Sequence, residues 1–376
     1  MKNNKASRKA WVKTLYPQSV VWEVTLACNM RCLHCGSSAS PLRKRPDELS
    51  TKEALNLIVD FKELGVERVC FSGGEPFLRT DWEKLAVCLA RLGMRPGFIS
   101  NGFLIDRNLA QKLSKLRKYG LVVSLSVDGD EKTHDLIRQT KGSFQKSMQA
   151  LDLLCAEGVA TSVITSVHKI NLPVLPNISK EIFKYNIGAW QLQLAVPWGR
   201  MAENKEALLS PADYLELVDF FLQQRKLHKN RVCVPDNIGY FTKAEKECRP
   251  DLPWKGCQAG MMIMGITSNG GVTGCLSLQE ERFIEGNVRE RSLKDIWFDP
   301  ELFSYNRKFK ITDLKGFCRR CEHGADCRGG CKSTAYGFSG CLFESYYCLY
   351  RIEQKQGVPA DSFSFRKTLG AGKYHP

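Results

Sequence analysis

The chain has 376 residues, of which 43% are hydrophobic and 25% are charged. This length and apolar share exclude a small scaffold held together by disulfides, and they predict a sizeable core and more than one domain. An excess of 55 Lys and Arg over 40 Asp and Glu gives a net charge of +15, which would attract an acidic partner such as a nucleic acid, an acidic peptide or a polycarboxylate metabolite. The basic residues are scattered, and no recognition helix, RNA-binding motif or arginine tract stands out, so we do not expect a nucleic-acid partner.

The sequence contains no apolar run long enough to cross a bilayer and no secretory apolar segment behind its basic start. We therefore expect a cytoplasmic protein without a membrane partner. Sixteen cysteines in a reducing compartment are poorly explained by disulfides, so the clustered ones are expected to bind a metal or an iron–sulfur cluster.

Residues 1–18 form a basic N-terminal extension, and residues 19–229 then alternate between strand and helix patterns. The first strand, SVVWEVTL, precedes STKEALNLIVDFKELG, in which the Ser/Thr start, Glu53 and the closing Gly65 are typical of a capped amphipathic helix. Helical patterns also follow the five later strands, VERVCFS, RPGFIS, LVVSLSVDG, VATSVITSVH and AWQLQLAV. Six strands that are each followed by a helix predict a parallel α/β sheet, either open and doubly wound or a partial barrel of the TIM kind. Both architectures bind ligands at the carboxyl ends of their strands.

From about residue 230 glycine, cysteine and short strand-like pieces replace this alternation. In GITSNGGVTGCLSL, the residues Asn269-Gly270-Gly271 look like a hairpin turn between two strands. We interpret residues 230–256 as a bridging segment, 257–350 as a second, small α+β domain, and 351–376 as a tail.

The segment CNMRCLHC follows the first strand and places Cys28, Cys32 and Cys35 within eight residues. Structural metal sites normally have four protein ligands, so this C-x3-C-x2-C triad leaves one position open, as catalytic metal sites do. Three thiolates suit three irons of a [4Fe-4S] cluster whose fourth iron takes a small molecule. The alternative is a zinc site completed by His34 or by a remote residue.

The second strand ends in the motif GGEP. Its glycines let the backbone approach a ligand, and its glutamate could pair with an ammonium group. Together, the cysteine triad and GGEP resemble the radical S-adenosylmethionine (SAM) superfamily. The resemblance implies a partial (β/α)6 TIM-like barrel in which the triad binds a [4Fe-4S] cluster and SAM chelates the fourth iron. It also implies that the SAM amino group is contacted by Gly73, Gly74, Glu75 and Pro76.

Further residues at strand ends extend the resemblance. SNG and SLSVDG end the third and fourth strands and contribute Ser100, Asn101, Ser124, Ser126 and Asp128. The resemblance implies that these groups face the cofactor, whereas ordinary turn chemistry is the alternative for the last three. It also implies that Arg138, in HDLIRQTKGSF, binds the SAM carboxylate, a task that suits a guanidinium.

The second domain has its own cysteine spacing. Cys257 begins the pattern C-x12-G-x4-C, CRRCEHGADCRGGC follows with the spacing C-x2-C-x5-C-x3-C, and Cys348 comes after sixteen more residues. This arrangement resembles the SPASM domain, a C-terminal extension with two auxiliary [4Fe-4S] clusters in radical SAM enzymes that act mostly on peptides. A double zinc ribbon is the alternative, because C-x2-C pairs also suit zinc.

The family's interleaved pattern implies which cysteines share a cluster. The outer auxiliary cluster would be bound by Cys318, Cys321, Cys327 and Cys348, and the inner one by Cys257, Cys275 and Cys331. Spacing favours Cys348 over Cys341. For the fourth inner ligand the resemblance favours Cys248, which lies upstream of Cys257 about where some members have an extra cysteine; Cys233 comes second, and a site without a fourth cysteine is the other possibility. The resemblance thus implies three [4Fe-4S] clusters and SAM.

An enzyme of this family would receive an electron from a donor such as flavodoxin or ferredoxin, cleave SAM and abstract a hydrogen atom from its substrate. We expect a radical SAM oxidoreductase that installs an oxidative crosslink in a ribosomally made precursor peptide. The main alternative is tetrapyrrole modification, as in haem biosynthesis, because a polycarboxylate suits the charge of +15. Sulfatase maturation is disfavoured because Leu276 replaces the aspartate that such enzymes use as a base. An electron carrier or a zinc-bound nucleic-acid protein would need no SAM pocket.

The sequence gives few indications of which residues contact the substrate. QLQLAVPWGR ends the sixth strand, so Gln191, Gln193, Trp198 and Arg200 could line the mouth of the cavity. For Trp198 we favour a role in sealing the junction between the two domains. The sequence does not identify a catalytic base.

Overall fold

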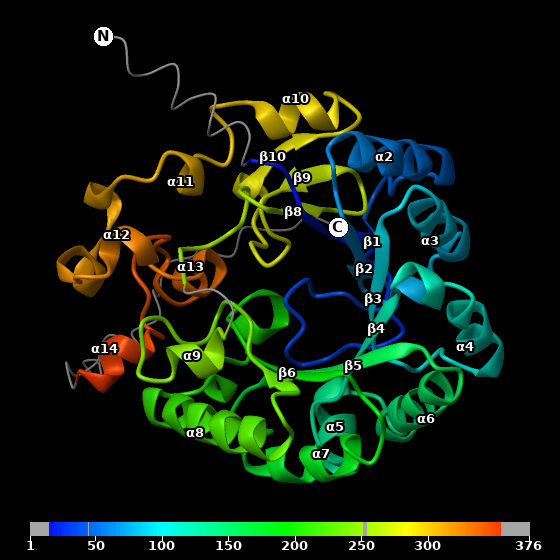
Figure 1. Ribbon diagram of the computed structural model, residues 1–376, viewed down its shortest axis with the longest axis horizontal. Helices are drawn as coiled ribbons and strands as arrows, with labels where there is room; N and C mark the ends of the chain where they lie inside the picture. The colour runs from blue at the N-terminus through cyan, green and yellow to red at the C-terminus, as the bar shows by residue number, and fades with distance from the viewer. Residues whose placement is uncertain (1–14, 44, 251–253, 355–376) are drawn as a thin grey trace.

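The computed structural model describes residues 15–43, 45–250 and 254–354. Its first six strands run parallel and pair in chain order, which confirms the predicted α/β barrel segment. Figure 1 shows them curving around a central loop, with helices on the outside. The strands are β1 (Ser19–Thr25), β2 (Arg68–Gly73), β3 (Arg95–Ser100), β4 (Val122–Ser126), β5 (Ala160–Val167) and β6 (Ala189–Leu194).

The helices that follow these strands cover the outer face of the sheet (Figure 1). They are α2 (Thr51–Glu63), α3 (Trp82–Arg91), α4 (Arg107–Ser114), α5 (Glu131–Arg138), α6 (Ser143–Ala156), α7 (Leu175–Ile182) and α8 (Pro211–Leu227). The expected capping of α2 is confirmed: the Ser50 hydroxyl accepts from the Glu53 amide, and the Glu53 carboxylate accepts from the Ser50 amide at 2.8 Å. Gly65 follows the last turn with φ +77°, a conformation that favours glycine.

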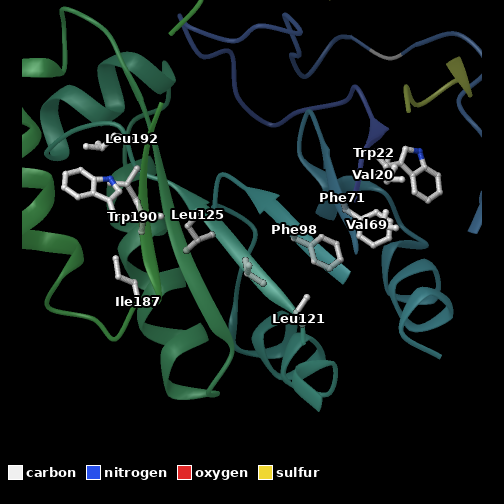
Figure 2. Close-up of a cluster of buried hydrophobic side chains, with 14 of the residues drawn as sticks. Val20, Trp22, Val69, Phe71, Phe98, Leu121, Leu125, Ile187, Trp190 and Leu192 are labelled. Atoms are coloured by element: carbon white, nitrogen blue, oxygen red, sulfur yellow. The ribbon is translucent and has the colours of Figure 1, made fainter. Parts of the chain in front are cut away.

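The main core lies between the sheet and these helices. Alternate strand positions point outward and are fully buried, among them Trp22, Phe71 and Phe98 (Figure 2). The Phe71 ring lies 5.7 Å from Trp22 and 4.9 Å from Phe98, measured between ring centroids. Each such side chain stabilises the fold by about 1.5–3 kcal/mol on burial, so this face fixes the register of the strands.

The opposite face of the sheet points into the barrel and has a different chemistry. Between the buried positions, β4, β5 and β6 carry half-buried side chains that are mostly small and polar. These are Ser124, Ser126, Ser162, Ile164, Ser166, Ala189, Gln191 and Gln193. The interior of the barrel at these strands therefore presents neutral hydrogen-bonding groups rather than a packed apolar core.

The second domain contributes strands to the same sheet, a feature that local sequence patterns did not predict. The hairpin at residues 269–271 is confirmed, because β8 (Ile263–Ile266) pairs antiparallel with β9 (Gly271–Thr273). β8 also pairs parallel with β1, and β10 (Ile284–Asn287) pairs with β9. With β7 (Val232–Cys233) beside β6, the sheet has ten strands in the order β10-β9-β8-β1-β2-β3-β4-β5-β6-β7.

Short helices complete the bridging segment and the second domain. They are α9 (Glu245–Cys248), α10 (Leu293–Phe298), α11 (Ser304–Arg307), α12 (Gly324–Cys327), α13 (Lys332–Ser339) and α14 (Leu349–Glu353). The domain boundaries proposed from the sequence remain predictions, and most of the N-terminal extension and of the tail lies outside the described residues. In the part of the chain that the structure describes, no helix is both long enough and apolar enough to span a membrane.

Candidate active site

The cysteine triad lies in the loop after β1, inside the curve of the sheet (Figure 1). Cys28 and Cys32 are buried and Cys35 is half-buried. Arg200 fixes this loop, because its Nε donates to the Cys32 carbonyl at 2.7 Å and its Nη2 donates to the Ala39 carbonyl at 2.8 Å. The suggestion that Arg200 lines the cavity mouth is therefore wrong. The chain after β6 folds back over the triad, and the Arg200 guanidinium hydrogen-bonds to backbone carbonyls there.

The glycines of GGEP allow two backbone segments to meet. A Cβ on Gly73 would lie 2.1 Å from the Thr25 carbonyl oxygen, and a Cβ on Gly74 would lie 2.0 Å from that of Ala27. The amides of Gly74 and Glu75 donate to the same two carbonyls at 2.9 and 2.8 Å. The end of β2 is thereby joined to the start of the triad loop, so these glycines position the cysteines.

Glu75 hydrogen-bonds to two other residues that were predicted to bind the cofactor. Its buried carboxylate accepts from the Ser100 hydroxyl and the Asn101 amide, both at 2.9 Å. Burial raises the pKa of Glu75 to about 7, although these hydrogen bonds favour the charged form. Asn101 continues toward the triad, with its Nδ2 donating to Asn29 Oδ1 at 2.7 Å and lying 4.0 Å from Cys28 Sγ. Glu75, Ser100 and Asn101 thus form one hydrogen-bonded unit beside Cys28.

Asp128 and Arg138 form a buried ion pair on the other side of the triad. The Arg138 Nη1 donates to Cys32 Sγ at 3.7 Å. Burial is the largest single influence and acts to raise the pKa of Asp128, but the charge of Arg138, the neighbouring histidines and the hydrogen bond from the Ser166 amide together hold this pKa well below its usual range. The Nε of Arg138 is buried and has no hydrogen-bond partner among the described residues. One donor of the guanidinium therefore remains for an anionic ligand.

Three histidines surround Asp128, and only His34 among them was proposed from the sequence as a ligand, at the alternative zinc site. The His34 Nε2 lies 3.5 Å from Asp128 Oδ2, the His134 Nδ1 accepts from the Asp128 amide at 3.1 Å, and the His168 ring lies 5.7 Å from that of His34. Burial lowers the pKa of His34 to about 3 and that of His168 to about 4, so both are neutral at physiological pH. His34 lies within the cysteine motif, between Cys32 and Cys35, and His168 directly follows β5; these positions are the only sequence signals that point to them.

Several polar atoms around Asp128 have no hydrogen-bond partner, and they indicate what kind of ligand the site binds. The His34 Nδ1 and both ring nitrogens of His168 are buried without a hydrogen-bond partner in the described residues. Because buried polar groups are normally satisfied, these atoms and the free Arg138 Nε fit a polar ligand beside the triad. The zinc alternative fits less well, because His34 is turned toward Asp128 and no three metal-binding side chains in the described ranges converge on one ion. Cluster thiolates bind different irons and need no such convergence.

The remaining predicted side chains lie along the barrel interior. The Ser124 and Ser162 hydroxyls hydrogen-bond across β4 and β5 at 2.7 Å, and Ser126 is half-buried at the end of β4. Trp198 stacks on Tyr336 of α13 with 5.7 Å between centroids, and its Nε1 donates to the Ser333 hydroxyl at 2.9 Å. Its expected role at the junction of the two domains is confirmed.

The assignment of the auxiliary cysteines to two sets remains a prediction, but the structure shows interactions within each set. The Cys331 thiol hydrogen-bonds to Cys257 and lowers its pKa to about 6, and Cys275 is influenced electrostatically by Cys257. In the other set, burial and the charges of the partner thiols raise the pKa values of Cys318, Cys327 and Cys348.

The fourth inner ligand proposed from the sequence does not lie with this set. Cys248 belongs to the main hydrophobic core, where its Sγ lies 3.3 Å from where a Cβ on Gly239 would stand, whereas Cys257 and Cys331 pack against a separate cluster. Cys233 lies in β7 opposite Gln191. The structure therefore argues against Cys248 because α9 buries its thiol in the core.

Comparison with known proteins agrees with this geometry. The radical SAM superfamily model matches residues 22–184, and the SPASM iron-sulfur cluster-binding domain model matches residues 257–322. An AdoMet-dependent heme synthase from Oleidesulfovibrio alaskensis is 32% identical over 352 residues, which cover 89% of this chain and 88% of that protein. This chain belongs to the radical SAM superfamily.

Two further proteins show the breadth of the similarity. Mycofactocin maturase MftC of Mycolicibacterium smegmatis is 29% identical over 334 residues, 86% of this radical SAM chain and 80% of that protein. The crystal structure of Streptococcus suis SuiB bound to S-adenosylmethionine matches with a TM-score of 0.70 and 19% identity, over 87% of this chain and 76% of that one. The last similarity concerns the fold alone.

Family membership makes the protein a radical SAM enzyme with iron–sulfur clusters and SAM as cofactors. When bound, these supply a 5′-deoxyadenosyl radical that removes a hydrogen atom from a substrate. Cys28, Cys32 and Cys35 would hold the cluster that meets SAM. Around them, Glu75 and Arg200 fix the loop, and Arg138 and the histidines offer unused polar atoms to the ligand.

Proposed function

We propose that this enzyme removes hydrogen from a carboxylate-bearing side chain of an iron tetrapyrrole. The observation that carries the proposal is the 32% identity with an AdoMet-dependent heme synthase, which extends over nearly the whole of both chains, second domain included. A relationship of that extent supports a shared substrate class more strongly than the fold does, because radical SAM folds serve many substrates.

The chemistry of the barrel interior supports the same substrate class. The strands β4, β5 and β6 contain no Asp or Glu, and the side chains that they turn inward include serines and glutamines. Such neutral donors bind carboxylates without repelling them. The net charge of +15 would in addition steer a polycarboxylate toward the protein.

The proposal assigns three [4Fe-4S] clusters: one at the triad and two at the auxiliary cysteine sets. We also place the reaction in a reducing cytoplasm with flavodoxin or ferredoxin as the electron donor, since all sixteen cysteines are free thiols. Gly73, Gly74, Glu75, Pro76, Ser100, Asn101, Asp128 and Arg138 are proposed to form the SAM site.

The test is a reaction of the anaerobically reconstituted, reduced enzyme with SAM and a ferric porphyrin whose propionate side chains carry deuterium. We expect the porphyrin to change mass and the deuterium to appear in 5′-deoxyadenosine. A variant with Cys28→Ala, Cys32→Ala and Cys35→Ala is the control and should do neither. SAM cleavage that proceeds without any deuterium transfer would contradict the tetrapyrrole substrate.

A precursor peptide is the second candidate, favoured by the 29% identity with a mycofactocin maturase over 86% of this chain. An extended peptide could add a strand at β7 or β10, which are the edges of the sheet. Co-expression with the small open reading frame nearest the gene tests this idea. A mass decrease of whole hydrogen atoms in the peptide, absent with the triple cysteine variant, would favour a crosslinking maturase.

A further inference from the structure

Lys332 is a fully buried cation in the second domain. It follows Cys331 directly, begins α13 and has 0% of its surface exposed. Lysine is almost never fully buried unless its charge is compensated, because moving an ammonium group out of water is costly. A fully buried lysine at this position therefore needs nearby groups that stabilise its positive charge.

The surroundings of Lys332 are built for an ammonium group. Its Nζ donates to the carbonyl of Arg328 at 2.6 Å and to that of Leu342 at 3.0 Å. It also lies 4.2 Å from the centroid of the Phe343 ring, where a cation is attracted by the π electrons. An ammonium has three N–H groups, so two carbonyls and one ring face satisfy all of them.

The same group is held next to residues of both auxiliary cysteine sets. Its Nζ donates to the carbonyl of Arg328, the residue after Cys327 of the outer set, and Lys332 itself follows Cys331 of the inner set. The Lys332 backbone amide also hydrogen-bonds to the Cys257 thiol. One residue thus contacts the inner set through its backbone and holds its side-chain charge beside the outer set as well.

We propose that Lys332 is a fixed cation, shared by the two auxiliary cysteine sets, that raises the reduction potentials of the clusters they hold. A positive charge in a low-dielectric interior stabilises the added electron of a reduced cluster. Both auxiliary clusters thereby become better electron acceptors. This inference rests on the auxiliary clusters of the proposed function and is independent of the substrate.

The test is an EPR-monitored redox titration of the reconstituted Lys332→Met variant, which removes the charge and keeps the length of the side chain. We expect the midpoint potentials of both auxiliary clusters to become more negative by at least ~59 mV. For a one-electron reduction, this shift corresponds to a tenfold change in the equilibrium constant. The cluster at Cys28, Cys32 and Cys35 serves as the internal reference and should not move. Lys294→Met, which removes an exposed lysine on α10, should shift no cluster.

Two companion variants separate charge from packing. Lys332→Arg keeps the charge and should restore much of the potential, whereas Lys332→Gln keeps hydrogen-bond donors without the charge and should behave like Lys332→Met. Unchanged potentials in the two neutral variants would show that Lys332 is merely structural and overturn the proposal. Loss of iron in both neutral variants would assign it to assembly instead and overturn the proposal as well. A wild-type chain that binds only one cluster would end this inference and the three-cluster assignment together, whereas inactivity toward porphyrins with three clusters present would reject only the substrate.

Discussion

The Nη1 of Arg138 lies 3.7 Å from the Sγ of Cys32, while the same guanidinium forms a buried ion pair with Asp128. The helix α5 therefore connects the triad loop to the end of β4. Such a pair is sensitive to the loss of one member, since the remaining charge is left buried without compensation.

We predict that Arg138→Met destabilises the protein by about 3–5 kcal/mol, because Asp128 keeps a buried, unpaired charge. The measurement is urea unfolding of the cluster-free protein. Asp128→Asn combined with Arg138→Met should recover part of the loss, since no uncompensated charge then remains. A loss in the double variant equal to the sum of the losses in Arg138→Met and Asp128→Asn would show that the two residues act independently.

The glycines of GGEP give a second prediction, which concerns the triad loop. Gly74→Ala should lower the iron content after reconstitution, because its Cβ would stand 2.0 Å from the Ala27 carbonyl and must displace the loop that carries Cys28. Gly188→Ala is the matched control, since its Cβ meets only the Thr161 carbonyl at 3.6 Å. Full iron content in Gly74→Ala would mean that the loop tolerates the displacement.

Much of the barrel could be predicted from the sequence because its signals are local. The inward and outward alternation along β4 to β6, and the capping pair of Ser50 and Glu53, lie within a few residues of each other. The two auxiliary cysteine sets were implied by the resemblance to the SPASM domain and remain predictions, although the structure places Cys331 in hydrogen-bond contact with Cys257. These features need no knowledge of how distant segments meet.

Features that depend on distant segments were missed. Pairing of β1 with β8 joins residues more than two hundred positions apart, and no local pattern encodes such a partner. Arg200 reaches the Cys32 carbonyl across 168 positions, so its assignment to the cavity mouth failed. Cys248 was chosen by spacing alone, although its burial in the core depends on how α9 packs.

His34 provides a third prediction, which decides between iron and zinc at the triad. Because its Nε2 faces Asp128 at 3.5 Å, His34→Phe should leave the iron bound by the triad unchanged. Metal analysis of the variant, with both auxiliary sets intact, measures iron and zinc per chain. Loss of zinc together with His34 would instead restore the zinc alternative.

The fourth prediction concerns pH and the contact between the two domains. Glu53 on α2 pairs with Arg289, just beyond β10, at 2.6 Å. Hydrogen bonding from Arg289 is the largest cause that lowers the pKa of Glu53 from 4.5 to about 2. A carboxyl whose pKa is lower in the folded state stabilises that state above its unfolded pKa, and this stability is lost as the pH falls through the folded value.

Arg289→Met should therefore cost less than about 1 kcal/mol at neutral pH, because the pair is partly exposed and screened by solvent. The difference between wild type and variant should shrink as the pH falls below 4.5, the ordinary value for Glu53. Urea unfolding of both cluster-free proteins between pH 7 and pH 2 measures it, with Lys294→Met as a control that removes an exposed charge from the same domain. A difference that stays constant toward acid would show that Arg289 acts through its contact with the Asp47 carbonyl at 2.7 Å rather than through the carboxylate.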